Sequence, residues 1–303
     1  MDLQSKMIGS QWIPWTQTHV SRQLDLILPL RYSTVRSPRE IVRKLFLNFE
    51  ISTPTAFSNS HPKVYHEAMS PSSGEINELR TLLARFPVWD RIPTPILDEL
   101  CNCTQTITVA HRRPLFLDDK PSSGIYVVKR GEFKVTLISS EGREQILYLA
   151  DRGKMIIEAF LPSGGPNHCS AFSRDESEAW ELASPNLCRL MSRSPELATA
   201  VAESMAFRSN RHIDLVFALS LRSVERRLAA FILELARRAH AEPGRTFVLP
   251  REINVSTVAC LLGTVREEVT RAQTRLQKKG LVQISRHQVV VHDIDALEAL
   301  VNE

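Results

Sequence analysis

Two short amphipathic helical patterns meet at a single glycine within residues 254–281, NVSTVACLLGTVREEVTRAQTRLQKKGL. The first begins at Asn254, a residue type that caps helix N-termini, and its apolar positions are Val258, Leu261 and Leu262. Gly263 follows where a sharp turn needs a positive φ. In the second pattern the apolar residues recur at helical spacing, at Val265, Val269, Ala272 and Leu276. Together they predict a helix-turn-helix.

The opposite face of the second helix carries Arg266, Glu267, Thr270, Arg271 and Thr274. An ordinary solvated face would have a similar composition. Here, however, the charges stand in the first turns, the part of a recognition helix that enters the major groove. Arginine bonds guanine O6 and N7, and glutamate accepts from cytosine N4. Arg275, Lys278 and Lys279 follow at the far end, where phosphates would lie.

The segment TVREEVTR, residues 264–271, resembles the recognition-helix motif of the Crp/Fnr family of bacterial transcription regulators, with the spacing R-E-x-x-x-R. The resemblance covers roughly residues 76–303. It implies that Arg266, Glu267 and Arg271 read base edges in a half-site resembling TGTGA, with Thr270 where many members have Gly or Ser. The predicted DNA-binding residues are Thr264, Arg266, Glu267, Thr270, Arg271, Thr274, Lys278 and Arg286.

Short extended runs separated by turns precede this domain, at 105–110, 113–117, 124–129, 132–138, 145–149 and 179–182. Helical patterns at 76–86 and 96–100 stand before them. Such runs predict a compact antiparallel β-roll or jelly roll. GIYVVKRGEFKVTL and GREQILYLADRG resemble the cyclic-nucleotide-binding-like domain of the same family. We therefore expect an α+β fold.

In that family, the resemblance implies, a Gly-Glu pair holds the ribose of a cyclic nucleotide, and an Arg-Ser or Arg-Thr pair holds its phosphate. The candidate effector-pocket residues here are Glu158, His168, Cys169 and Ser170. Because Cys169 stands at the arginine position, a buried phosphate would lack its counter-charge. We therefore do not expect cyclic AMP to bind in the usual manner. His168-Cys169 also permits a haem or redox interpretation, but ordinary loop residues explain the pair as well, and we expect neither haem nor a metal.

From Ser194 onward a long helix is predicted, with a stripe at Leu197, Val201, Ser204-Met205, Arg208, His212, Leu215-Val216 and Leu219. We interpret the stripe as a surface shared by two chains, because the resemblance places dimerisation here. The alternative is that the stripe packs only on its own β-roll. In either case His212 is interpreted as a polar break in the seam and not as a ligand. A further helix at 223–240, a β-wing at 281–292 and a helix capped by Asp293 complete the pattern.

Within residues 1–74, stretches such as STPTAFSNSHP and MSPSSG are rich in Pro, Ser and Thr, and the resemblance does not reach this segment. These residues are a sensing or partner-binding arm, a poorly ordered extension, or the result of an over-long start choice, since Met69 lies just before the recognisable domain. The domains predicted are 1–74, an uncharacterised extension; 75–193, a β-roll sensor; 194–221, a dimerisation helix; and 222–303, a winged helix-turn-helix.

The net charge of +4 permits nucleic-acid binding, and basic residues cluster before and within the motif. The first residues lack an apolar signal segment, so the five cysteines are expected to be reduced thiols of a cytoplasmic protein. No run has the apolar length of a membrane span. The sequence contains no Gly-rich phosphate loop, H-E-x-x-H or G-x-S-x-G, so we predict no catalytic residues and no enzyme.

These patterns predict a sequence-specific transcription regulator that binds a palindromic site as a homodimer. The partners expected are double-stranded DNA, a second copy of the chain, RNA polymerase and a small-molecule effector of unknown identity. The alternative function is a ligand-binding or protein-interaction module whose winged helix docks a partner protein without reading DNA sequence.

Overall fold

The computed structural model describes residues 67–239, 246–248, 253–285 and 288–302, all within one compact unit, Ser58–Glu303. The helix predicted from the pattern at 38–49 lies outside the described residues. Within the described part of the chain, no helix combines the length and the apolar character needed to cross a membrane.

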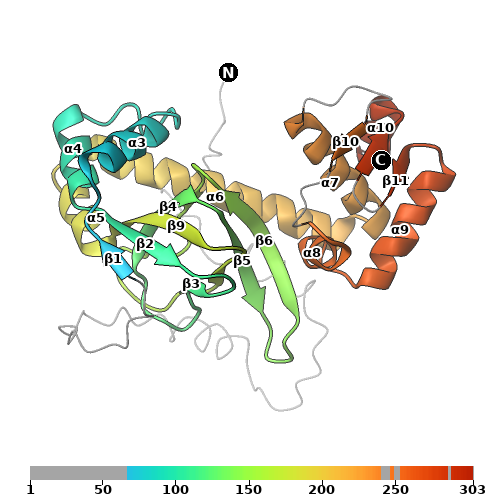
Figure 1. Cartoon of the computed structure of the whole chain (residues 1–303), viewed down its shortest axis with the longest axis horizontal. Helices are drawn as coiled ribbons and strands as arrows, with labels where there is room; N and C mark the ends of the chain where they lie inside the picture. Colours follow the sequence, from blue (N-terminus) through green and yellow to red (C-terminus); the bar gives the residue numbers. More distant parts are fainter. Residues whose placement is uncertain (1–66, 240–245, 249–252, 286–287, 303) are drawn as a thin grey trace, which may run out of the picture. The chain divides into compact units, whose positions relative to one another are not determined.

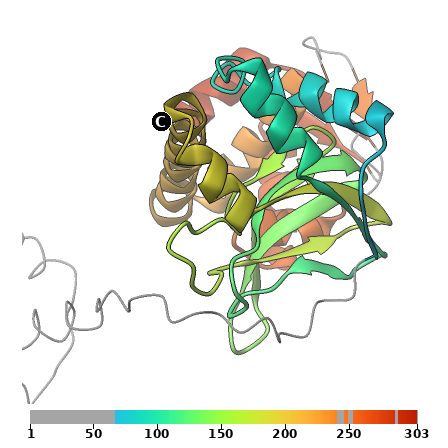
Figure 2. The same cartoon turned by 90° about the vertical axis from the view of Figure 1, so that its left-hand side faces the viewer.

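Two antiparallel sheets form the predicted β-roll (Figures 1 and 2). The five-stranded sheet has the order β1-β2-β9-β4-β7, and the four-stranded sheet has the order β3-β8-β5-β6. The strands are β1 Glu67–Met69, β2 Gln105–Val109, β3 Pro114–Phe116, β4 Gly124–Arg130, β5 Glu132–Ile138, β6 Glu144–Asp151, β7 Met155–Ile156, β8 Ser170–Ser173 and β9 Ser177–Ala183.

The apolar run of β4 separates two cores. Ile125 and Val127 belong to the core between the five-stranded sheet and the flanking helices. Tyr126 and Val128 point the other way, into a second core of the β-roll, because successive side chains of a strand alternate between faces. A strand that is buried on both faces has a continuous apolar sequence, and this is why all four residues from Ile125 to Val128 are apolar or aromatic.

Three short helices cover the outer face of the five-stranded sheet, namely α3 Ser73–Leu83, α4 Thr94–Asn102 and α5 Ser184–Met191. They contribute Leu79, Leu100 and Leu187 to the first core, where each is at most 1% exposed. α3 begins with a capping box, in which the Ser72 side chain accepts from the Glu75 N–H and the Glu75 carboxylate accepts from the Ser72 N–H.

The long helix α6, Pro195–Leu221, begins at the N-cap Ser194, as predicted. The stripe assigned to a second chain is mostly directed at the helix's own domain. Leu197 and Val201 are buried in the first core, and Ser204 accepts a 2.9 Å hydrogen bond from the Trp89 indole. The interpretation of this stripe as a shared surface is therefore wrong for its first turns, whereas Met205 and Val216 of the same stripe are exposed. A helix on a domain surface shows the same periodicity as one between chains.

The winged helix-turn-helix consists of α7 Val224–Arg238, α8 Val255–Leu261, α9 Arg266–Lys278, α10 Ile294–Asn302 and a three-stranded sheet of order β10-β12-β11. The strands are β10 Thr246–Val248, β11 Val282–Ile284 and β12 Gln288–Val291. The Asp293 carboxylate accepts from the Ala296 N–H at 2.8 Å and so caps α10, as predicted.

Sequence patterns missed or misread several elements near the end of the β-roll. β1, β7, β8 and α5 carry no separate signal in the sequence. The charged run Asp175-Glu176-Ser177-Glu178 is typical of a solvated turn before a strand, but its second half lies within β9. Ser177 is fully buried in β9, and Glu178 pairs with Lys129 and Arg130.

Glu75 gives the fold a predicted pH dependence. Its hydrogen bond with Lys129 on β4, followed by those with Ser72, lowers the pKa of the Glu75 carboxyl from 4.5 to about 2. A carboxyl whose pKa is lower in the folded state stabilises the fold above its unfolded pKa and loses that effect as pH falls. We expect Glu75→Gln to lower the unfolding free energy by about 1–2 kcal/mol near pH 7. Urea denaturation should show this difference shrinking between about pH 4.5 and 2; a difference that stays constant across this range would contradict the assignment.

Candidate nucleic-acid interface and effector pocket

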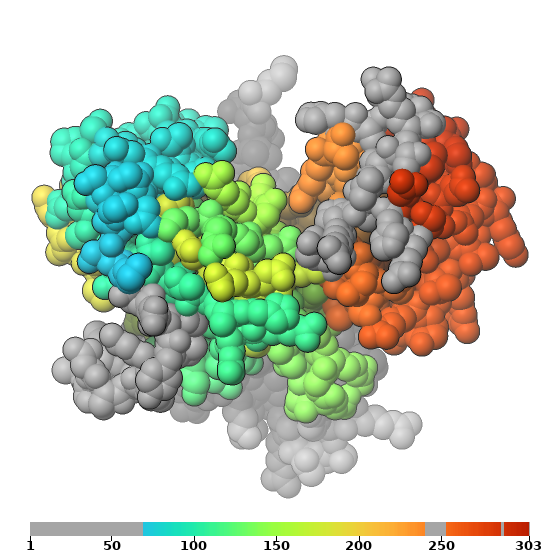
Figure 3. Space-filling model, viewed as in Figure 1, coloured from blue at the N-terminus to red at the C-terminus, as the bar shows by residue number. Residues whose placement is uncertain are grey.

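The buried stripe of α9 fixes this helix against the rest of its domain. Val269, Ala272 and Leu276 are fully buried in a core that also contains Leu228 of α7 and Val258 of α8. Because these three residues share one side of the helix, the opposite side remains at the surface, in the region coloured orange to red in Figure 3. α9 is therefore firmly seated, with an exposed outer face.

The turn between α8 and α9 has the features that the sequence predicts. Asn254 caps α8, because its side-chain oxygen accepts from the Thr257 N–H at 2.9 Å. Gly263 has a φ of +59°. A Cβ atom here would lie 2.5 Å from Leu219 Cδ2 and 2.6 Å from Gln145 Oε1, distances that real side chains do not tolerate. The positive φ favours glycine here, and a larger residue would also have to displace the ends of the Leu219 and Gln145 side chains.

Six of the predicted DNA-binding residues are exposed together on the outer face, namely Arg266, Glu267, Thr270, Arg271, Thr274 and Lys278. Thr264 is half-buried in the turn, and Arg286 lies outside the described residues. The Thr270 hydroxyl donates to the Arg266 carbonyl at 3.0 Å, and the Thr274 hydroxyl donates to the Thr270 carbonyl at 3.1 Å. Both hydroxyl hydrogens are thus used within the helix.

Two carboxylates that the sequence interpretation did not single out hold cations of this helix. Glu268 lies 2.6 Å from the Arg271 guanidinium, three positions along α9. Glu225 on α7 is mostly buried and lies 2.9 Å from Arg275 and 2.7 Å from Lys279. Burial raises the pKa of Glu225, but Lys279 and Arg275 outweigh this effect and hold it below its ordinary value. Arg275 and Lys279, expected at phosphates, are therefore already paired within the protein.

The first effector-pocket residue, Glu158, is held by the protein's own side chains. Its side chain is 9% exposed. The Tyr148 hydroxyl donates to Glu158 Oε2 at 2.5 Å, while Arg208 and His212 of α6 lie 3.1 and 3.5 Å from Oε1. The Arg208 guanidinium also lies 3.9 Å from the centre of the Tyr148 ring. His212, interpreted as a polar break, thus contacts the carboxylate of the predicted pocket.

The other predicted pocket residues do not form a phosphate clamp. Cys169 is buried, and the Ser170 hydroxyl is 3.0 Å from the Asp118 carboxylate. Burial, together with Glu158 and Asp118, raises the pKa of the Cys169 thiol to about 12. A phosphate at this place would meet a neutral thiol and two nearby carboxylates, so the residues do not fit a cyclic nucleotide held in the usual manner. His168 is exposed, whereas Cys169 is not, so the two side chains do not share one environment.

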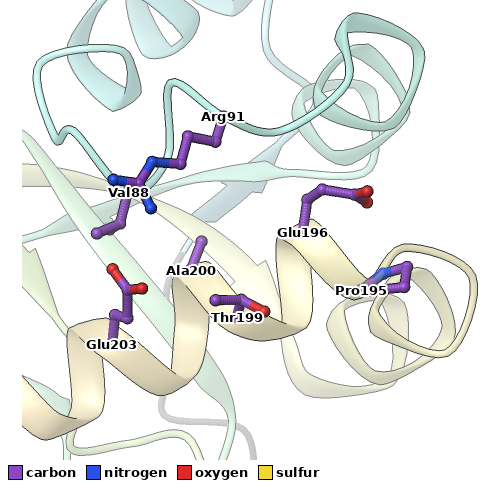
Figure 4. A pocket seen from close by; sticks show the side chains of 7 residues that line it. All are labelled: Val88, Arg91, Pro195, Glu196, Thr199, Ala200 and Glu203. Carbon is purple, nitrogen blue, oxygen red and sulfur yellow. The ribbon is translucent and has the colours of Figure 1, made fainter.

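Two surface hollows lie elsewhere. One, of about 200 Å³, lies between the segment after α3 and the first turns of α6 (Figure 4), and its lining includes Arg91, Glu196 and Glu203. The other, of about 540 Å³, lies between the β-roll and α8. Two of its cations, Lys134 and Arg174, are paired with Glu144 and Glu132. None of the four predicted pocket residues lines either hollow.

Comparison with known families matches both halves of the described structure. Residues 226–300 match the model of the Crp-like helix-turn-helix domain, and residues 107–194 match that of the cyclic nucleotide-binding domain. The chain belongs to the Crp/Fnr family of transcription regulators. The predicted α+β architecture of β-roll, long helix and winged helix-turn-helix is confirmed.

Relatives of this Crp/Fnr-type chain are regulators. It is 22% identical over 216 residues to a CRP-like cAMP-activated global transcriptional regulator of Mycobacterium tuberculosis, covering 71% of this chain and 96% of the relative. It is 28% identical to the fumarate and nitrate reduction regulatory protein of Salmonella typhimurium, over 67% of this chain and 82% of the relative. The structure of FixK2 from Bradyrhizobium japonicum shares the fold, with a TM-score of 0.56, 21% identity and coverage of 65% and 96%.

The environment of Cys169 makes a prediction about its reactivity. A thiol with a pKa of about 12 is almost entirely protonated near neutral pH, and the thiolate is the reactive form. We expect Cys169 to resist iodoacetamide at pH 7.5 in the folded protein and to react once urea unfolds the chain, as measured by peptide mass spectrometry. Labelling of folded Cys169 at the rate of an exposed model thiol would refute the buried, neutral state.

Proposed function

We propose that this Crp/Fnr-type regulator binds a palindromic DNA site with TGTGA-like half-sites as a homodimer. The observation that supports this most strongly is the joint exposure of Arg266, Glu267 and Arg271 on the outer face of α9, whose inner face is locked in the core. Arginine can bond guanine bidentately, and glutamate can accept from the cytosine amino group. A firmly seated helix presents these groups with little loss of backbone freedom on binding.

Phosphate contacts would position the helix in the groove. Lys278 is exposed at the C-terminal end of α9, and Arg286 in the wing is proposed to reach the backbone as well. Such contacts add affinity on all sequences and depend on salt, because bound cations displace condensed counterions. The Thr270 and Thr274 hydroxyls donate within α9, but these two residues and Thr264 still have an acceptor oxygen and a methyl group that could contact DNA.

The proposed dimer forms through the outer face of α6. Large apolar side chains are exposed there, where a lone soluble helix would be polar; they are Met205, Phe207, Ile213, Val216, Phe217 and Leu221, at 36–69% exposure. Pairing this face with that of a second copy would bury it. Two recognition helices related by a two-fold axis would then meet successive major grooves about 34 Å apart.

The effector is proposed to differ from a cyclic nucleotide bound in the usual manner, because Cys169 replaces the phosphate-binding arginine. A ligand that competes for Glu158 would also release Arg208 and His212 of α6. Since the other face of α6 is the proposed dimer surface, ligand binding can shift the population of dimers that fit both half-sites. RNA polymerase as partner, the cytoplasm as location and the domain limits at 193/194 and 221/222 belong to the same proposal. The limit predicted at 74/75 moves to a position before β1, because β1 pairs with β2 in the five-stranded sheet.

We expect Arg266→Ala and Arg271→Ala each to cost about 1–3 kcal/mol on the preferred site and to relax the preference at particular base pairs. Lys278→Ala is the matched control, because it should weaken binding to all sequences alike and flatten the salt dependence. Duplexes selected from random DNA by the full chain supply the sites, and titrations at several salt concentrations measure the affinities. If Arg266→Ala selects the same sequences as the unchanged chain, the assignment of Arg266 to base reading is wrong.

The dimer is tested separately. Ile213→Asp places a charge in the centre of the exposed apolar face of α6, and desolvating it in an interface would be costly. We expect this variant to sediment as a monomer and to lose affinity for the palindrome at least tenfold, while Ile213→Leu behaves as the unchanged chain. Dimers of unchanged stability in Ile213→Asp would exclude this face as the interface.

A further inference from the structure

Val265 is an apolar side chain at the start of the recognition helix that the fold does not explain. It is the N-cap of α9, with φ −99° and ψ 159°, and no side-chain hydrogen bond caps the helix. Its side chain is 58% exposed, so it makes only a small contribution to the core. Neither helix formation nor burial accounts for a valine here.

Other helices of the chain show what this position usually provides. Ser72, Ser194, Ser223 and Asn254 cap α3, α6, α7 and α8 with side-chain oxygens. Helices α4 and α5, which lack such a cap, have a proline in the first turn. α9 has neither a capping side-chain oxygen nor a proline in its first turn. A polar N-cap would stabilise α9, so its absence at an exposed position suggests that another contact uses the valine.

The surroundings of Val265 indicate what that contact is. Arg266 follows directly, and the first turn of such a helix is the part that enters the major groove. The hydroxyl hydrogens of Thr270 and Thr274 are used within α9, and both residues are exposed, so their methyl groups are also available for contact. In the major groove, thymine is the base with an apolar group, the 5-methyl, and apolar side chains read it by contact.

We propose that Val265 is a specificity-determining residue that covers the 5-methyl group of one thymine in each half-site. The contact would remove both apolar groups from water, which is favourable at an otherwise wet interface. This inference rests on the proposed function. It adds an uncharged residue, which needs no hydrogen bond, to the proposed base readout by Arg266, Glu267 and Arg271.

The test uses the full chain and duplexes in which uracil replaces thymine. Uracil differs from thymine only by lacking the 5-methyl group and pairs with adenine in the same way. A half-site is first obtained by selection from random DNA, and each of its thymines is then replaced singly. We expect affinity to fall about fourfold at one thymine of the half-site, the effect of one buried methyl group.

Two variants assign the effect to Val265. Val265→Ser supplies a capping oxygen, so the chain should remain folded with an equal or higher melting temperature by circular dichroism. It should bind the thymine and uracil duplexes equally at the sensitive position. Val265→Thr keeps one methyl group and should retain part of the discrimination. Val255→Ser, which changes another exposed valine of this domain, at the start of α8, is the matched control and should keep the unchanged profile.

The outcomes separate the two proposals. If selection yields no preferred sequence, the proposed function fails, and this inference fails with it. If a preferred sequence appears but no thymine is sensitive to uracil, or Val265→Ser keeps the same sensitive position as the unchanged chain, the proposed function stands and the role of Val265 is refuted. Loss of the uracil effect in Val265→Ser, together with its retention in Val255→Ser, supports the contact.

Discussion

The packing of α9 against α7 and α8 is the constraint on which the reading surface depends. Val269, Ala272 and Leu276 are fully buried, so rotation of the helix about its axis would expose them and bury charge, both of which are unfavourable. Gly263 closes the turn with a positive φ that favours glycine, next to the ends of the Leu219 and Gln145 side chains. Core packing, and not any contact with DNA, therefore decides that Arg266, Glu267 and Arg271 stand outside.

The two faces of α6 connect the β-roll to the proposed dimer. One face carries Arg208 and His212, which meet the buried carboxylate of Glu158 beside the Tyr148 hydroxyl. The other carries Phe207, Ile213 and Val216, which are exposed. The helix moves as one body. A shift of α6 caused by changed contacts with Glu158 would therefore also move the outer face, on which the second copy is proposed to pack. In this family member the pocket carboxylate already has partners, and any ligand there must compete with α6 itself.

The sequence predicts the helix-turn-helix in detail because its signals are local, namely an Asn cap, a glycine with positive φ and a helical apolar stripe. It predicts most strands of the β-roll for the same reason. The sequence does not predict β8, because this strand has only four residues and a buried serine at each end. It does not predict α5 either, because this helix follows β9 directly, without a separating turn. The first turns of the α6 stripe pack on the protein's own β-roll through Leu197 and Val201, whereas Met205 and Val216 of the same stripe are exposed. Periodicity indicates an apolar face but does not identify what covers it. Glu225 was missed because its partners lie 50 residues or more away in the chain.

The carboxylates on the reading domain have a consequence for specificity. Glu268 holds Arg271, and Glu225 holds Arg275 and Lys279. Non-specific affinity for DNA grows with the number of phosphates that free cations neutralise, so internal pairing lowers it. The exposed ion pair between Arg271 and Glu268 is worth about 1 kcal/mol or less. A base with two acceptors in good geometry can therefore replace Glu268 as the partner of Arg271, whereas a base without them cannot. In the proposed complex, the pairing of Arg271 with Glu268 would weaken binding to random sequence more than binding to the preferred site. It would thereby raise the ratio of the two affinities, on which a regulator in a genome depends.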